Sequence, residues 1–168
     1  MASTYTPIAT TSINTNTTSV TYSSISGSYT DLIAVVQGTA DNNNTPTGMS
    51  SFGFTVNGDT GANYSRITVY GNGTSAASGL VANETKELLG QINPSNIGNT
   101  IFHFMNYSNT TTYKTFLSRA DVSSNIASAW IGTWRSTSAI NSITFGYFDG
   151  GGNFKSGTTI TLYGITAA

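Results

Sequence analysis

The chain has 168 residues and a formal net charge of −1, and only 8% of its residues are charged, against about 25% in an average soluble domain. Its six basic residues are scattered singly, so there is no basic cluster for nucleic-acid phosphates or anionic lipid, and we expect neither partner. The absence of cysteine excludes disulfides, and a single histidine excludes a zinc site in practice.

The length is typical of one domain, and no linker or shift in composition divides the chain, so we expect a single domain over residues 1–168. Residues 1–19 are polar and lack the charged and apolar regions of a signal peptide. No apolar run approaches the ~18–20 residues that span a bilayer. We therefore expect a protein that is made in a cytoplasm and has no membrane segment.

Strands are predicted throughout the first half of the chain. Residues 4–11 and 20–25 are Thr-rich, which suits a pleated edge, and the continuously apolar residues 31–37 indicate a strand buried on both faces. The clearest unit is residues 52–73, where Phe52, Phe54 and Val56 alternate with small polar residues before a tight loop and a second strand. The small, polar residues 74–83 that follow predict a loop.

The second half predicts further strands. Residues 84–92 fit either two helical turns or a strand, and we favour a strand because the surroundings are β. A hairpin is predicted from strands at residues 100–106 and 112–119, followed by strands at residues 127–135, 141–148 and 158–165. This pattern of about ten short strands, with a helical alternative only at residues 84–92, predicts an all-β, antiparallel β-sandwich, with a jelly-roll-like arrangement as the best fit.

No constellation for catalysis emerges from the residue pattern. The single histidine, His103, lies between two phenylalanines of a predicted strand, which favours a structural role over that of a base. No G-x-S-x-G nucleophile motif occurs. Glu84 and Glu87 are the only neighbouring acids, and we interpret them as a solvated patch rather than a glycosidase pair. We expect no enzyme activity.

Metal and cofactor sites are also not expected. Asn57, Asp59 and Asn63 place oxygens in one loop but carry a single charge, so a structural turn is favoured over a calcium site. The glycines at 150–152 follow one strand and precede another, which predicts a hairpin loop rather than a phosphate cradle at a helix N-terminus.

Three aromatic residues are the candidates for contact with a glycan or a protein partner. Trp130 and Trp134 share one face of a predicted strand, with Gly132 between them, and Tyr113 precedes a neighbouring strand. Such side chains stack on sugar rings when they are exposed, although aromatics in a sandwich usually belong to the core. Both alternatives remain open, because alternation does not indicate which face points inward.

Five short stretches carry a resemblance to a known family. They are residues 28–32 (SYTDL), 57–65 (NGDTGANYS), 70–73 (YGNG), 139–144 (AINSIT) and 162–165 (LYGI). Together they resemble small virion proteins of tailed bacteriophages, especially phages of cyanobacteria, whereas residues 94–122 carry no match. The resemblance implies a virion structural protein, either a capsid decoration (cement) protein or a short tail fibre, generally a trimer of β-sandwiches without catalytic residues.

Two hypotheses follow from the residues and the resemblance. The first, which we favour, is a cement protein on the outer surface of the virion, a homotrimer that clamps neighbouring subunits of the major capsid protein. A predicted strand comes almost at the start of these residues, so we expect no N-terminal coiled-coil or anchoring domain of the kind that a fibre would carry. The second is a tail-fibre adhesin that recognises host glycans through the region of Trp130 and Trp134.

Overall fold

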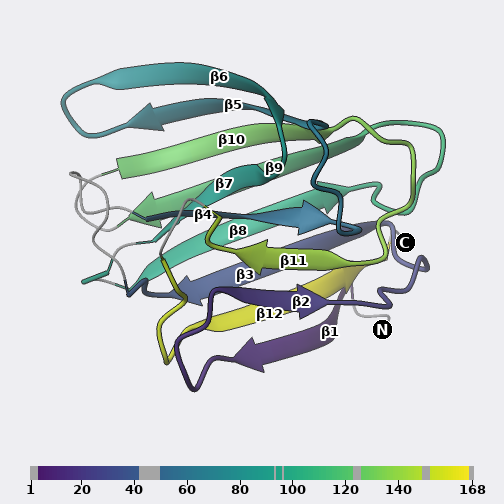
Figure 1. Ribbon diagram of the computed structural model, residues 1–168, viewed down its shortest axis with the longest axis horizontal. Coiled ribbons are helices and arrows are strands. Elements are labelled where there is room, and N and C mark those ends of the chain that lie inside the picture. Colours follow the sequence, from purple (N-terminus) through teal and green to yellow (C-terminus); the bar gives the residue numbers. More distant parts are fainter. Residues whose placement is uncertain are drawn as a thin grey trace.

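The computed structural model describes residues 4–41, 50–92, 94–95, 97–122, 126–148 and 152–166, and all regular structure in them is β (Figure 1). The strands are β1 (Tyr5–Ser12), β2 (Ser19–Tyr22), β3 (Asp31–Gly38), β4 (Ser50–Val56), β5 (Tyr64–Gly71), β6 (Ala76–Glu84), β7 (Glu87–Ile92), β8 (Gly98–Met105), β9 (Lys114–Val122), β10 (Ile126–Trp134), β11 (Ile143–Gly146) and β12 (Thr159–Ile165). The part of the chain that the structure describes contains no helix of the length and apolarity needed to cross a bilayer.

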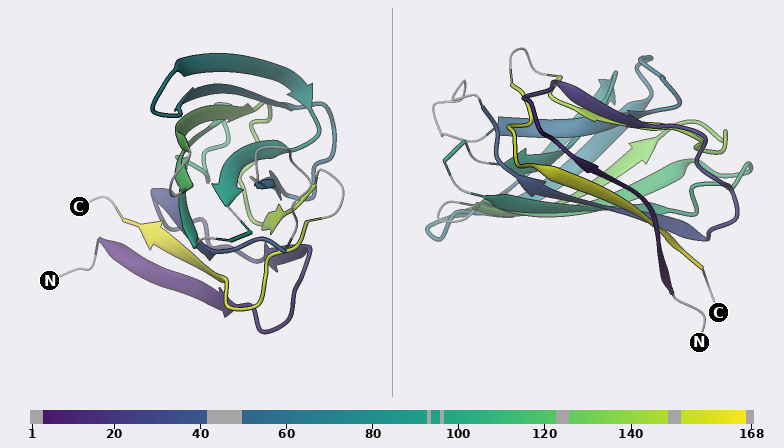
Figure 2. Two further views of the ribbon diagram at one scale, coloured as in Figure 1. Left: turned by 90° about the vertical axis from the view of Figure 1, so that its left-hand side faces the viewer. Right: turned by 90° about the horizontal axis from the view of Figure 1, so that it is seen from below.

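The strands form two antiparallel sheets. The large sheet has eight strands in the order β1-β12-β3-β8-β9-β10-β5-β6, and the small sheet has four in the order β2-β11-β4-β7. In Figure 2 the large sheet curves partly around the small one, with β5 and β6 at one end and β1 at the other. The predicted all-β antiparallel sandwich is thus confirmed, whereas the connectivity specific to a jelly roll is not established.

The core lies between the two sheets and is rich in phenylalanine. Phe52, Phe54 and Val56 of β4 are fully buried, as their alternation predicts. The ring of Phe54 meets four other phenylalanine rings at centroid distances of 4.8–6.1 Å, from β8, β9 and β11. Each such pair of rings stabilises the fold by about 0.5–1.5 kcal/mol, in addition to the contribution of the apolar area that it buries. These contacts join the sheets and explain how a chain of modest apolar content forms a stable core.

Hydroxyl groups of the large sheet fix β7 at the edge of the small sheet. Ser118 of β9 donates a hydrogen bond of 2.5 Å to the carbonyl of Leu89, and Thr100 of β8 donates one of 3.2 Å to the carbonyl of Gln91. Both hydroxyl-bearing side chains are buried. Backbone carbonyls that would be unpaired at a sheet edge are therefore satisfied from the facing sheet.

Two predictions about residues 74–92 require correction or refinement. Residues 74–83 were expected to form a loop, but most of them belong to β6, which pairs with β5 along its whole length. The apolar-polar alternation is weak there because β6 is an exposed edge strand of small side chains. The helical alternative for residues 84–92 is wrong, since Glu84 ends β6 and Glu87–Ile92 form β7.

Candidate functional site

The outward side of the large sheet carries an uninterrupted row of directly opposed residues, here called the cross-sheet row. Its members, from the β6 edge to the β1 edge, are Leu80, Ile67, Ile131, Leu117, His103, Ile33, Tyr163 and Pro7. Seven of the eight side chains are apolar or aromatic. The four nearest β6 are large aliphatic side chains that are 71%, 51%, 55% and 42% exposed. Such a row on an outward face is unusual, because outward positions of a sandwich are normally polar.

A second row of opposed residues lies beside the cross-sheet row on the same outward side and widens this apolar surface. Val69 is 57% exposed beside Ile67, and Ala129 and Ile101 follow on β10 and β8. They line a shallow hollow of about 630 Å³, whose lining also includes Asp121 and Arg119, the residue between Ala129 and Ile101 in this row. We call the six large aliphatic residues of the two rows between β6 and β8 the outer apolar face; they are Leu80, Ile67, Ile131, Leu117, Val69 and Ile101. Single exposed apolar side chains need no explanation, but a contiguous group indicates an interaction surface.

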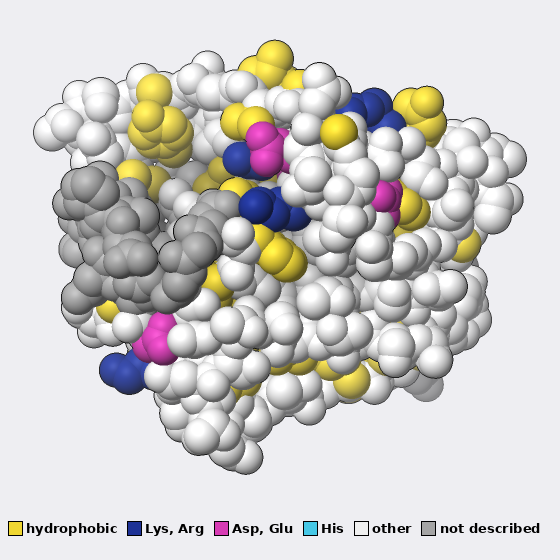
Figure 3. Space-filling view, in the orientation of Figure 1, with side chains coloured by type: hydrophobic (Ala, Val, Ile, Leu, Met, Phe, Trp, Pro, Cys, Tyr) yellow, Lys and Arg dark blue, Asp and Glu magenta, His cyan; other side chains and the backbone are white. Residues whose placement is uncertain are grey.

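The opposite side of the molecule is different in character. Figure 3 shows the side on which the small sheet lies, where uncharged polar groups cover most of the surface and charged side chains occur in small, separate groups. This is the polar, weakly charged surface expected from the composition. The two sides of the sandwich therefore offer a partner distinct chemistry.

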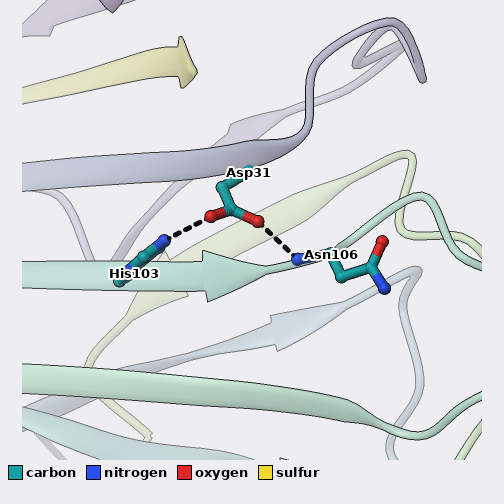
Figure 4. A network of polar contacts seen from close by, with 3 residues as sticks. All are labelled: Asp31, His103 and Asn106. Carbon is teal, nitrogen blue, oxygen red and sulfur yellow. Dashed lines mark hydrogen bonds and ion pairs between the residues drawn. The ribbon is translucent and has the colours of Figure 1, made fainter. Parts of the chain in front are cut away.

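His103 is held by an acidic partner at the end of β8 (Figure 4). Its Nε2 lies 2.9 Å from Oδ2 of Asp31, while the backbone N–H of Asn106 donates to Oδ1 of the same carboxylate at 2.6 Å. Asp31 thereby connects the start of β3 to the turn after β8. Among the described residues this carboxylate is the polar partner of the imidazole, so His103 is a paired strand residue.

The loop between β4 and β5 is organised by Asp59. Its Oδ1 accepts a hydrogen bond from the backbone of Gly61, and its Oδ2 accepts hydrogen bonds from Asn63 and from the indole of Trp134. Burial raises the pKa of Asp59, but these hydrogen bonds outweigh it and leave the pKa below its ordinary value. Both oxygens of the Asp59 carboxylate therefore already accept hydrogen bonds from the protein itself. The described residues contain no cluster of three or more His, Cys, Asp or Glu suited to a metal ion.

The three aromatic candidates do not form one exposed platform. Trp130 and Trp134 are 4% and 3% exposed and belong to the core, whereas Tyr113 is 57% exposed. Lys114 is paired with Trp134 across β9 and β10, so Tyr113 lies at the same end of the sheet. Both tryptophans are therefore core residues, and of the three candidates only Tyr113 is exposed to a glycan or a protein partner.

A cleft between the layers lies where β5 and β6 face β7. Its volume is about 580 Å³, and its walls include Arg66, Tyr70, Gln91 and the largely buried Trp130. Gln91 is oriented by a hydrogen bond from Ser128 to its Oε1. We call it the interlayer cleft. Guanidinium, amide and phenol groups beside an aromatic edge are the kinds of group that bind polar ligands.

Glu87 was expected to be solvated, and this prediction is wrong. The side chain is fully buried, and neither carboxylate oxygen has a hydrogen bond of regular geometry in the described structure. Gly132 makes room for it, because a Cβ there would lie 3.0 Å from Cδ and Oε1 of Glu87. Burial raises the pKa of Glu87 to about 8, with Arg66 opposing part of the rise. In the sequence, the only sign of this close approach between Glu87 and β10 was Gly132, which stands between Trp130 and Trp134.

Comparison with known proteins assigns no family to the chain. No protein-family model matches the chain, and none of the curated proteins matches it. The function must therefore be argued from the surfaces and clusters described above. They comprise an outer apolar face, an interlayer cleft lined by both polar and apolar side chains, and ionisable groups that are paired or buried within the fold.

Proposed function

We propose that the protein is a non-enzymatic structural component of a bacteriophage particle, a capsid decoration (cement) protein on the outer surface of the head. In this proposal it binds the major capsid protein through the outer apolar face and stabilises the capsid lattice. The resemblance of five sequence stretches supplies the phage context. The observation that carries the proposed mode of action is the outer apolar face itself.

The outer apolar face offers enough unburied surface for a stable contact. Fully burying one aliphatic side chain of this size stabilises by about 1.5–3 kcal/mol. Leu80, Ile67, Ile131, Val69 and Leu117 are between 42% and 71% exposed, so each can still gain part of this amount. Their joint burial would contribute on the order of several kcal/mol, before the cost of association is subtracted. A repeated lattice adds many such contacts per particle.

The contact is testable with paired isoleucine variants. Ile67→Ser/Ile131→Ser removes two neighbouring members of the cross-sheet row, and Ile97→Ser is a control at a 66%-exposed isoleucine outside the two rows. We expect the double variant to lose at least about tenfold in affinity for capsid shells that lack the protein, measured by co-sedimentation. Unchanged binding by the double variant, with the fold intact by circular dichroism, would contradict the proposed contact.

The second candidate is a tail-fibre adhesin that binds host glycans, and the interlayer cleft favours it. Arg66 and Gln91 offer side-chain donors there, and Tyr70 offers aromatic surface next to the largely buried Trp130. A glycan array distinguishes the candidates. A signal that is lost in both Arg66→Ala and Gln91→Ala but kept in Tyr113→Ala would support an adhesin that uses the cleft, and the absence of any signal would count against it.

A further inference from the structure

The two edges of the large sheet are built differently. β1, at one edge, contains Pro7 and a register shift between Pro7 and Ala9, both of which disrupt regular pairing with a further strand. β6, at the other edge, has nine residues, and its only charged residue is Glu84 at the very end. Residues 76–83 include no proline and no charge. Over residues 76–82, before the bulge at Asn83, β6 therefore lacks the features with which natural edge strands avoid pairing.

The edges of the small sheet offer no comparable strand among the described residues. β2 has only four residues. β7 is mostly buried, and its Leu89 and Gln91 carbonyls already accept hydroxyl hydrogen bonds from the large sheet. In Figures 1 and 2, by contrast, β6 lies at the outermost end of the large sheet with no strand beyond it. One long backbone edge thus remains for pairing in the described structure.

We propose that β6 pairs antiparallel with β6 of a second copy of this chain, about a two-fold axis perpendicular to the sheet. The second copy is the occupant that the chemistry favours, because the paired strands would both be uncharged and their small side chains would not clash. β1 of another copy is a poor alternative, since Pro7 and the register shift interrupt its edge. A two-fold contact is also self-complementary and closed.

The regular part of β6 fixes the expected register. A bulge ends it at Asn83, which has a φ of 60° and lies between the paired residues Ala82 and Glu84. The midpoint of residues 76–82 is Gly79, so a two-fold axis there places Ser78 of one copy opposite Leu80 of the other. The two Leu80 side chains then become diagonal neighbours. Leu80 is the most exposed large apolar side chain described, at 71%, and the pairing would bury part of its surface against the second copy.

This pairing would also join the outer apolar faces of two copies on one side of a continuous sheet. Because Leu80 begins the cross-sheet row, the rows of both copies would meet at the axis. The proposal is independent of the phage assignment, since it depends only on the backbone edge and the side chains of β6. It predicts a two-fold dimer rather than the homotrimer that the resemblance implies.

The test uses charge on the paired strands. Ser78→Lys/Leu80→Lys places like charges opposite each other in the proposed register, and Thr10→Lys/Ser12→Lys adds the same charge to the same face at the β1 edge. In sedimentation velocity we expect the wild type and the β1 control to reach twice the chain mass of 17.6 kDa. We expect the β6 lysine variant to remain at the chain mass.

A complementary variant makes the result specific. Ser78→Glu/Leu80→Glu should also be a monomer alone, and mixing it with the lysine variant should restore a one-to-one dimer in low salt. The glutamate variant gives the same readout should the lysine variant fail to fold by circular dichroism. A wild type that is monomeric at every concentration, a trimer, or lysine and glutamate variants that do not recombine would each overturn the proposal.

Discussion

At the residue scale, Glu87 is the side chain whose environment departs furthest from what its type leads one to expect. It is fully buried against Gly132, and its oxygens have no regular hydrogen bond among the described residues. A carboxyl group in such a place is more stable neutral than charged, which is why its pKa rises to about 8. The fold therefore holds an extra proton near neutral pH compared with the unfolded chain.

This proton makes the free energy of unfolding depend on pH. Below pH 4.5, the ordinary value for the group, Glu87 is protonated in both states. Between pH 4.5 and about 8 it ionises in the unfolded chain but stays protonated in the folded one, so stability falls as pH rises. The slope from this residue approaches about 1.4 kcal/mol per pH unit at most.

Glu87→Gln should remove that dependence. An amide of the same shape stays neutral at all pH values, so we expect a higher melting temperature than wild type at pH 8 and a flatter profile between pH 5 and 8. Glu84→Gln, three residues before Glu87 in a partly exposed position, is the matched control and should keep most of the wild-type slope, because Glu84 is the smallest of the causes that shift the pKa of Glu87. Thermal unfolding followed by circular dichroism measures both. A wild-type slope in Glu87→Gln would show that another group controls it.

At the element scale, β7 is positioned by the facing sheet as much as by its partner β4. The register with β4 shifts between Phe52 and Phe54, and the carbonyls of Leu89 and Gln91 turn to hydroxyl groups of β9 and β8. Gly53 of β4 permits the close approach at this shift, since a Cβ there would overlap the backbone carbonyl of Glu87. This is how the chain brings Glu87 and the interlayer cleft to their places.

Ser118→Ala tests this anchoring of β7. The change leaves the buried carbonyl of Leu89 without the 2.5 Å hydrogen bond, so we expect a loss of about 1–3 kcal/mol in the free energy of unfolding. Ser78→Ala, on the exposed face of β6, is the control and should change it by less than about 0.5 kcal/mol. Chemical denaturation measures both values. Equal stability of the two variants would mean that the hydroxyl does not hold β7.

How far each element could be predicted depends on how strongly its residues alternate. β4 was predicted because its large apolar residues, Phe52, Phe54 and Val56, alternate with small or polar ones, and the hairpin of β8 and β9 followed from similar patterns. β6 could not be predicted, because an exposed edge strand buries too little of either face to leave an alternating pattern. Its strand character comes from pairing with β5, which is a tertiary effect.

The candidate site was less accessible from the sequence than the fold. The cross-sheet row joins residues from eight strands, and only their register brings them into line. An outward Ile67 or Ile131 looks like a core residue in sequence, because alternation does not distinguish the two faces of a sheet. The tryptophans illustrate the same limit, since both the core and the glycan alternatives fitted their pattern until burial placed them in the core.

At the scale of the whole molecule, the proposed contact with a capsid is apolar and only weakly charged. The chain has a net charge of −1, and Arg119 and Asp121 are the charged residues that line the outer hollow. Screening by salt acts on charges and leaves apolar burial largely intact. We therefore expect a ~10-fold increase in salt to change the affinity for capsid shells by less than about threefold. A steep loss with salt, measured by co-sedimentation, would indicate an electrostatic contact instead.

The most direct test of the account is an electron cryo-microscopy map of phage particles that contain this protein. We predict density for the sandwich at regular positions on the outer head surface, with β5, β9 and β10 turned so that Ile67, Leu117 and Ile131 face the capsid. Density confined to the tail, or on the head with this side of the large sheet turned to solvent, would contradict the proposed function.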